Sequence, residues 1–198
     1  MSVAAIVLAA GGSRRMGHPK ALLPLGATTF LGRIVATARE AELEPIHVIV
    51  GDDAVTIAVA HPELARGMIH NVRPDLGPLS SLRLGLAALP PSVDGAVVFP
   101  VDHPLVQAAT VRALVGAFRQ VGRPIVVPIH GGQRGHPTLF ARETFAELAT
   151  APLEEGARAV VRADPARVAE VEVDDPGILA NVDTPDAYRE LIGDGRAG

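Results

Sequence analysis

A glycine-rich loop with two arginines and a lysine follows the first apolar run of the chain. Residues 3–8 (VAAIVL) are apolar, and residues 9–20 continue as AAGGSRRMGHPK. Glycines let the backbone approach an anion closely, successive N–H groups can point at it, and Arg15 and Lys20 can neutralise its charge. The spacing matches neither the G-x-G-x-x-G dinucleotide loop nor the G-x-x-x-x-G-K-[ST] phosphate loop. The pattern therefore predicts a phosphate-binding loop of a third kind, in a nucleotide-handling enzyme.

An aspartate follows a second apolar run, in the segment VVFPVDHP at residues 97–104. Magnesium binds hard oxygen donors, typically one or two protein carboxylates together with substrate phosphates, so Asp102 is a candidate Mg²⁺ ligand. Aspartate is equally a preferred residue at a helix N-cap, and a helix is expected to begin near Leu105. The residue type and position leave both interpretations open.

Two further acidic patterns could contribute to such a site. Asp183 lies two residues before Pro185, which suits the first turn of a helix, so the pattern by itself favours a helix cap. Asp183 would complete a metal site with Asp102 if the chain brought this segment back over the sheet. Asp52 and Asp53 also follow an apolar run, and here a solvated turn is the favoured interpretation.

The other polar candidates give weaker signals. Ser80 and Ser81 stand at the start of a predicted helix, where capping is favoured over a base or sugar contact. His103 and His136 have no further His or Cys at ligand spacing, so zinc is not expected. The nucleophile motif G-x-S-x-G is absent. An anion loop with separate carboxylates suits in-line phosphoryl or nucleotidyl transfer, in which positioning and charge neutralisation do most of the catalysis.

Alternating strand and helix patterns must position these residues. Strands are predicted at residues 3–8, 46–50, 68–72, 96–99, 125–129 and 168–173, and helices at 29–42, 79–89, 107–121, 142–148, 156–163 and 185–192. Nearly continuous apolar strands indicate a sheet covered on both faces, so the fold class is α/β, doubly wound and mostly parallel. Ligands then bind beyond the carboxyl ends of the strands. Residues 128–140 break the periodicity and predict a hairpin-like excursion that lines the site.

Composition sets broad limits. The chain has 198 residues, no cysteine, a formal net charge of −4 and 3% aromatic residues. We expect residues 1–198 to form a single domain. The lack of cysteine excludes disulfides and thiolate catalysis and fits a cytoplasmic protein. The negative charge and scarce aromatics argue against nucleic-acid binding, and we expect neither a secretory signal nor a membrane span.

Four segments resemble a known family. Residues 8–20 (LAAGGSRRMGHPK) resemble the L-A-A-G-x-S-x-R-M-G-x-x-K loop of MobA-like nucleotidyltransferases. Residues 80–86 (SSLRLGL), 135–140 (GHPTLF) and 175–185 (DPGILANVDTP) are similar to segments of the molybdenum cofactor cytidylyltransferase branch. The resemblance spans almost the whole chain. It implies a Rossmann-like fold of the nucleotide-diphospho-sugar transferase type.

The resemblance also implies a reaction and a set of roles. The reaction is Mg²⁺-dependent transfer of CMP from CTP to molybdenum-molybdopterin, which gives molybdopterin cytosine dinucleotide and pyrophosphate. The product would serve an enzyme of the xanthine dehydrogenase type. By position, Arg15 and Lys20 would neutralise the triphosphate, Asp102 would be the principal metal ligand and catalytic residue, and Asp183 a second ligand. The nucleotide-binding set implied is Leu8, Ala9, Ala10, Gly11, Gly12, Ser13, Arg15, Lys20, Ser80 and Ser81.

Departures from the branch pattern bear on the base. Residues 100–104 (PVDHP) and 77–79 (GPL) are closer to the guanylyltransferase branch, and Asn181 replaces the first aspartate of the branch's D-I-D. The Ala9-Ala10 step favours a pyrimidine, because the guanylyl branch usually has L-A-G-G and a methyl group changes how closely a large base can approach. CTP is therefore the expected nucleotide and GTP the alternative.

Two other hypotheses remain open. The acceptor could instead be a sugar phosphate or another small phosphorylated molecule. A non-catalytic protein that binds and delivers nucleotide or cofactor is a hypothesis of another class. The presence of both carboxylates and Lys20 argues against it.

Overall fold

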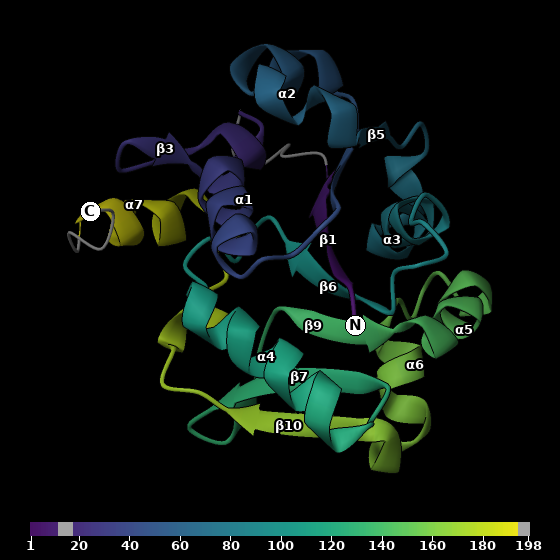
Figure 1. Ribbon diagram of the computed structural model, residues 1–198. Helices are drawn as coiled ribbons and strands as arrows, with labels where there is room; N and C mark the ends of the chain where they lie inside the picture. Colours follow the sequence, from purple (N-terminus) through teal and green to yellow (C-terminus); the bar gives the residue numbers. More distant parts are fainter. Residues whose placement is uncertain (12–17, 194–198) are drawn as a thin grey trace.

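The computed structural model describes residues 1–11 and 18–193, which form a central sheet with helices on both faces (Figure 1). The strands of this sheet are β1 (Val3–Ala9), β4 (Ile46–Val50), β5 (Met68–His70), β6 (Gly95–Pro100), β7 (Ile125–His130), β8 (Gln133–Arg134), β9 (Thr138–Ala141) and β10 (Val168–Glu172). The helices are α1 (Phe30–Glu40), α2 (Ala54–Ala60), α3 (Pro78–Ala87), α4 (Ala108–Val121), α5 (Phe145–Thr150), α6 (Arg158–Ala163) and α7 (Pro185–Gly193). A separate two-stranded hairpin joins β2 (Pro24–Leu25) to β3 (Thr28–Thr29).

The strand order is β10-β7-β9-β6-β1-β4-β5, with β8 paired to β7. Strand β1 pairs in parallel with β4 and β6, and β4 with β5 and β10 with β7 are also parallel. Strand β9 runs antiparallel between β6 and β7. The predicted α/β, mostly parallel architecture is therefore confirmed, with one antiparallel strand inside the sheet.

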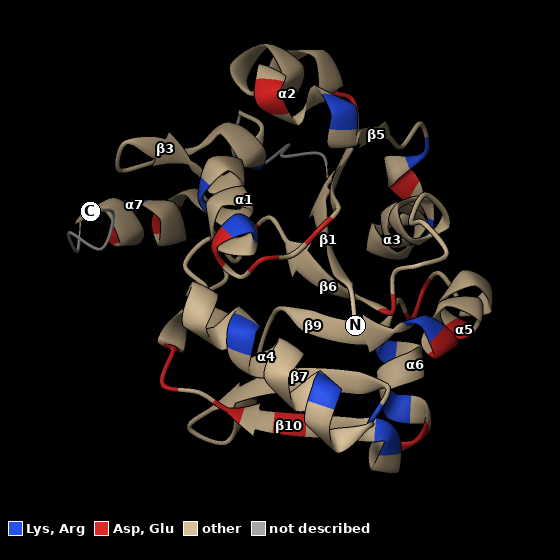
Figure 2. Ribbon diagram, viewed as in Figure 1, with Lys and Arg blue, Asp and Glu red and all other residues tan. Residues whose placement is uncertain are grey.

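Two hydrophobic layers sandwich the sheet, because alternate residues of each strand face opposite sides. Ala5 and Val7 of β1 belong to the cluster covered by α1 and α4. Ala4 and Ile6 belong to the cluster covered by α3, α5 and α6. All four side chains are fully buried, and strands β1, β6 and β9 contain no charged residue, whereas glutamates lie on the edge strand β10 (Figure 2). This explains the nearly continuous apolar strands of the sequence.

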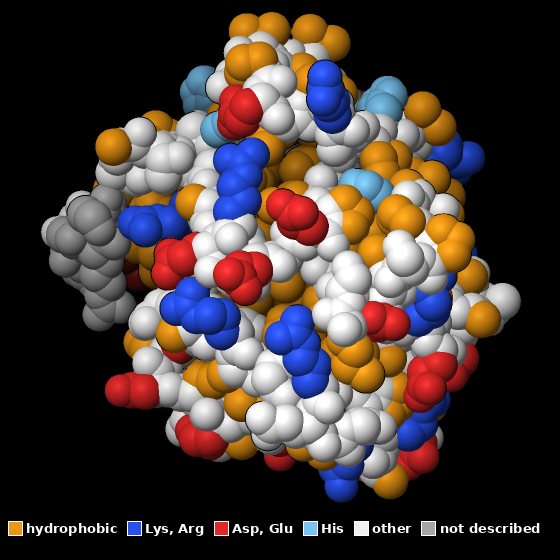
Figure 3. Space-filling view, viewed as in Figure 1, with side chains coloured by type: hydrophobic (Ala, Val, Ile, Leu, Met, Phe, Trp, Pro, Cys, Tyr) orange, Lys and Arg blue, Asp and Glu red, His pale blue; other side chains and the backbone are white. Residues whose placement is uncertain are grey.

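Two expectations about the elements were incomplete. Residues 138–140 belong to β9 in the middle of the sheet, so only β8 and the adjoining turns form the predicted excursion. Helix α2 was not predicted, because its sequence AVTIAVA has no polar face from which to recognise a helical period. Val55 and Val59 of this helix are exposed, and hydrophobic side chains cover the top of the molecule in Figure 3.

Within residues 1–11 and 18–193, no helix has the length and apolar character needed to cross a membrane.

Helix α3 packs so closely on β1 that one of its positions has no room for a side chain. An ideal Cβ on Gly85 would lie 2.7 Å from Cγ2 of Ile6, which is fully buried. We expect Gly85→Ala to lower the free energy of unfolding by about 1–3 kcal/mol through overpacking. Gly116→Ala in α4 is the matched control, because its Cβ meets nothing within 4 Å, and it should raise stability by about 0.5–1 kcal/mol. Urea unfolding measures both, and equal effects would contradict the packing argument.

Candidate functional site

The parallel strands β1, β4 and β6 end at one edge of the sheet. In the register, Leu8 of β1 lies beside Pro100 of β6, and Ala9 lies beside Val50 of β4. The segments that follow these strands therefore start from neighbouring points. This is the carboxyl edge at which open α/β sheets bind ligands.

The exits of β1 and β4 are in close contact. Ala9 and Ala10 are buried, Leu8 is half-buried and Gly11 is exposed. An ideal Cβ on Gly51 would lie 2.6 Å from the carbonyl oxygen of Ala10, so a glycine is required there. The remaining predicted loop residues, Gly12, Ser13 and Arg15, lie outside the described part of the chain.

Asp102 leaves β6 in a turn and does not cap a helix. Helix α4 begins at Ala108, with Gln107 as its N-cap residue. The backbone N–H of Gln107 donates to the Oδ2 atom of Asp175, 2.9 Å away. The capping alternative for Asp102 is therefore wrong, which leaves its carboxylate available for another partner.

The surroundings of Asp102 favour its ionised form. Burial alone would raise the pKa of Asp102, but the hydrogen bond and charge interaction with His103 and the nearby Lys20 ammonium hold that pKa below its ordinary value. Nδ1 of His103 lies 3.0 Å from Oδ1 of Asp102. At neutral pH this carboxylate is therefore charged, as a metal ligand must be.

The segment that carries Asp183 does reach Asp102, although 80 residues separate the two aspartates in the chain. The backbone N–H of Val182 donates to the carbonyl oxygen of Asp102 at 2.8 Å. The ammonium of Lys20 forms an ion pair with Asp183. The predicted cap role of Asp183 is wrong, because Thr184 Oγ1 accepts the Ala187 N–H in the first turn of α7. Three of the predicted residues, Lys20, Asp102 and Asp183, thus come together.

A buried carboxylate that was not predicted brings the Asp183 segment back over the sheet. Asp175 is 2% exposed and accepts hydrogen bonds from the Gln107 N–H (2.9 Å), the Thr110 hydroxyl (2.6 Å) and the Gly177 N–H (2.9 Å). These charge-assisted bonds offset the cost of burying the carboxylate. A Cβ on Gly177 would overlap the carbonyl oxygen of Leu105, so the two segments are in direct backbone contact. The only local signal in the sequence is an Asp-Pro pair, which is common in turns.

The two carboxylates fit a magnesium ion that also binds a phosphate substrate. Magnesium usually takes one or two protein carboxylates and completes its shell with waters and substrate phosphates. Asp102 and Asp183 supply such a pair. In the described residues, no three His, Asp or Glu side chains form a metal-binding group. Asp52 and Asp53 lie in the turn before α2, with Asp52 exposed.

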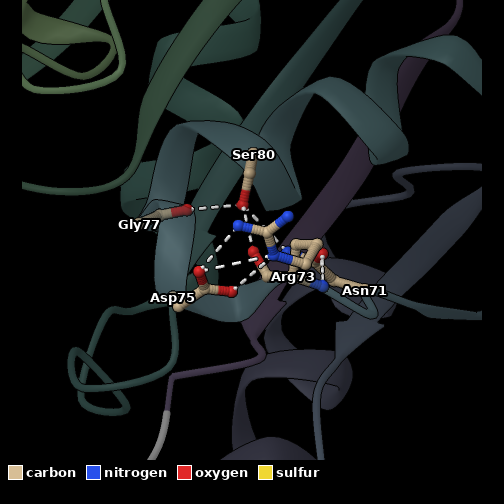
Figure 4. Close-up of polar contacts among 5 residues, drawn as sticks. All are labelled: Asn71, Arg73, Asp75, Gly77 and Ser80. Atoms are coloured by element: carbon tan, nitrogen blue, oxygen red, sulfur yellow. Dashed lines mark hydrogen bonds and ion pairs between the residues drawn. The ribbon is translucent and has the colours of Figure 1, made fainter.

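The loop after β5 is ordered by a buried asparagine (Figure 4). Asn71 is 2% exposed, and its Nδ2 donates to the hydroxyl oxygens of Ser80 and Ser81, both at 2.9 Å. Its Oδ1 accepts the Arg73 N–H at 2.9 Å, and the Ser80 hydroxyl donates to the Gly77 carbonyl at 2.7 Å.

The predicted capping role of the two serines is wrong. Gly77 is the N-cap residue of α3, and no side chain accepts a hydrogen bond from the free N–H groups at this helix N-terminus. Ser80 and Ser81 instead hold Asn71, and through it the loop that carries the exposed Arg73–Asp75 ion pair. The polar Asn71 near the carboxyl end of the strand predicted at residues 68–72 was the signal that could have indicated its role.

Two imidazoles lie beside Asp102. The rings of His103 and His136 meet edge to face, with centroids 4.7 Å apart. Part of His136 is exposed, but burial, reinforced by the nearby His103, lowers its pKa to about 4, against the opposing charge of Asp102. His136 is therefore neutral at physiological pH.

Comparison with known proteins agrees with this arrangement. The family model of the MobA-like NTP transferase domain matches residues 5–171. A probable molybdenum cofactor guanylyltransferase from Mycobacterium avium is 31% identical and covers 96% of this chain and 95% of its own length. The bifunctional protein GlmU from Clavibacter sepedonicus is 34% identical over 60% of this chain, which spans only 25% of that protein.

Solved structures extend the likeness to the whole chain. The crystal structure of Rv0371c from Mycobacterium tuberculosis H37Rv has a TM-score of 0.84 and 31% identity, with 98% of each chain covered. A structure of Rv0371c in complex with manganese has a TM-score of 0.78 and 29% identity, covering 98% of this chain and 99% of that one.

The Asp175 anchor can be tested with a matched pair of substitutions. Asp175→Asn places an amide NH₂ group, which is a donor, among four other donors, so we expect the free energy of unfolding to fall by about 2–3 kcal/mol. Asp164 is the control, because it also precedes a proline and accepts a backbone N–H at 2.9 Å, from Ala166, but is exposed. Asp164→Asn should change stability by less than about 0.5 kcal/mol, since asparagine caps as well as aspartate. Equal losses in urea unfolding would contradict the anchoring role.

Proposed function

This chain belongs to the MobA-like NTP transferase domain family, and on that premise we propose that residues 1–198 act as one domain that transfers a nucleoside monophosphate to molybdenum-molybdopterin. The observation that carries the proposal is the meeting of Lys20, Asp102 and Asp183 at the carboxyl edge of the sheet. The named molybdenum cofactor guanylyltransferase among the relatives supports the acceptor.

In the proposed reaction, an oxygen of the acceptor's terminal phosphate bonds to the α-phosphorus of the triphosphate. The bond from that phosphorus to the pyrophosphate oxygen breaks, and pyrophosphate leaves. A bound Mg²⁺ neutralises phosphate charge and polarises the reacting centre. Asp102 and Asp183 would hold this ion, and carboxylate oxygens are the donors it prefers. No nucleophilic side chain is needed, because the acceptor phosphate is the nucleophile.

Basic residues supply the remaining charge compensation. Lys20 lies beside both carboxylates, where its ammonium can contact the triphosphate that shares the cation. We assign Arg15 the same role on the strength of the sequence. The nucleotide-binding set is that of the family motif: Leu8, Ala9, Ala10, Gly11, Gly12 and Ser13 from the first loop, with Ser80 and Ser81 acting through the Asn71 loop that they order.

We propose CTP as the nucleotide. The methyl group of Ala10, which is buried at the end of β1, fills space that a glycine would leave open to a larger base. GTP is the second candidate, and the name of the M. avium relative favours it. The product would then serve an enzyme of the xanthine dehydrogenase type.

Pyrophosphate release from CTP in the presence of Mg²⁺ and molybdenum-molybdopterin tests the metal assignment. We expect Asp102→Ala to slow the reaction by at least about 100-fold, because the cation would lose its principal protein ligand. Asp52→Ala is the matched control, since it removes an exposed carboxylate from a neighbouring strand exit, and it should keep the wild-type rate. Full activity of Asp102→Ala would show that the metal is bound elsewhere.

The choice of base is tested by thermal shift with CTP, GTP, UTP and ATP, each with Mg²⁺. At 100 times the dissociation constant, the correct nucleotide should stabilise the chain by about 2.7 kcal/mol. We expect the largest shift with CTP, and an increased response to GTP in Ala10→Gly. A response to GTP alone in the wild-type chain would overturn the cytidylyl assignment. Tight binding without pyrophosphate in a single turnover would instead identify a delivery protein.

A further inference from the structure

His103 contacts Asp102 in a geometry that fixes both side chains. Nδ1 of His103 lies 3.0 Å from Oδ1 of Asp102, and the backbone N–H of His103 donates to the Pro100 carbonyl. An ionised carboxylate has no proton to give, so Nδ1 of the imidazole carries the hydrogen and donates it. Nδ1 of His103 is therefore the donor in this contact.

The His103 ring is also braced from its other side. His103 is 8% exposed, and the ring of His136 meets it at an interplanar angle of 69°. His136 is itself held, because its backbone N–H donates to the Ile178 carbonyl at 3.0 Å. A Cβ on the preceding Gly135 would lie 2.5 Å from the same oxygen, so this turn is tightly seated. The segment that returns Asp183 to the site therefore also fixes the histidine pair.

Asp102 needs such a constraint. Its side chain is 24% exposed on a turn, and the Lys20 ammonium lies close enough to attract it. Carboxylates that bind metals are usually oriented by hydrogen bonds from neighbouring groups, whose loss typically costs about 10–100-fold in metal affinity or activity. His103 is the side chain that makes this contact to Asp102 among the described residues.

We propose that His103 is a positioning residue that holds the Asp102 carboxylate in one orientation for a divalent cation, with His136 as the brace of its ring. The inference rests on the proposed function in giving Asp102 the role of metal ligand. It differs from a simple packing role, in which any side chain of similar volume would serve.

Binding of Mn²⁺ to the full chain in the presence of CTP distinguishes the positioning role from the packing role. The electron paramagnetic resonance signal of free Mn²⁺ measures this binding. Asparagine at position 103 places an amide nitrogen where Nδ1 stood, whereas leucine retains volume without a donor. We expect His103→Leu to weaken Mn²⁺ binding by about 10-fold or more and His103→Asn to restore most of it. His47→Leu is the control, since its ring contacts the Gly85 carbonyl away from Asp102. Equal losses in the Leu and Asn variants, or none in either, would overturn the proposal.

Two further measurements separate failure of this proposal from failure of the proposed function. If Asp102→Ala binds Mn²⁺ as the wild type does, the metal role of Asp102 and the proposal built on it both fail. If Asp102→Ala loses binding and His103→Leu keeps it, only the positioning role fails. Nitrogen NMR of the His103 ring needs no activity. It should show a hydrogen on Nδ1 in the wild type, and a wild-type ring without an Nδ1 hydrogen would refute the hydrogen bond.

Discussion

The buried carboxylate of Asp175 is the interaction on which the site depends. A carboxylate that is 2% exposed is costly to bury unless its oxygens accept hydrogen bonds, and four donors from two segments supply them. The same bonds tie the chain after β10 to the N-terminus of α4. The backbone N–H of Val182 then donates to the carbonyl oxygen of Asp102, so Asp183 lies at the exit of β6, a position that its local sequence does not predict. One buried acid thus determines where another acid lies.

The sheet brings further polar residues to the edge that the Asp183 segment reaches. Parallel strands β1, β4 and β6 end side by side, so Asp102, which follows β6, starts from the same edge as the segment that leads from β1 to Lys20. The Lys20 ammonium pairs with Asp183 and, together with the larger contribution of His103, lowers the pKa of Asp102, so one cation links the two carboxylates. A site that holds both carboxylates and an ammonium is suited to a divalent cation and a polyphosphate, because the carboxylates can bind the cation and the ammonium can bind the phosphates.

The antiparallel strand β9 brings His136 to this edge of the sheet. Its insertion between β6 and β7 directs the preceding turn, with Gly135 and His136, toward Ile178 and His103. The strand order therefore explains why His136, in a segment that is similar to a family motif, lies beside Asp102. On the other flank, Asn71 orders the loop after β5 through two serines. Buried polar side chains thus shape both sides of the candidate site.

The sequence by itself determined the α/β class, the positions of the principal strands and helices, the family and the three residues that meet. Apolar periodicity and a loop motif are local signals, so they can be recognised in the sequence without the structure. It did not determine whether Asp102 and Asp183 cap the helices that follow them, because an aspartate before a helix has the same local pattern whether or not it caps. The tertiary structure excluded capping, because Asp175 and Thr184 accept the N–H groups at the neighbouring helix ends. It likewise decided the central place of β9, the helical form of α2 and the contact between His103 and Asp102. Each of these depends on partners distant in sequence or on the direction of a side chain, neither of which residue spacing records.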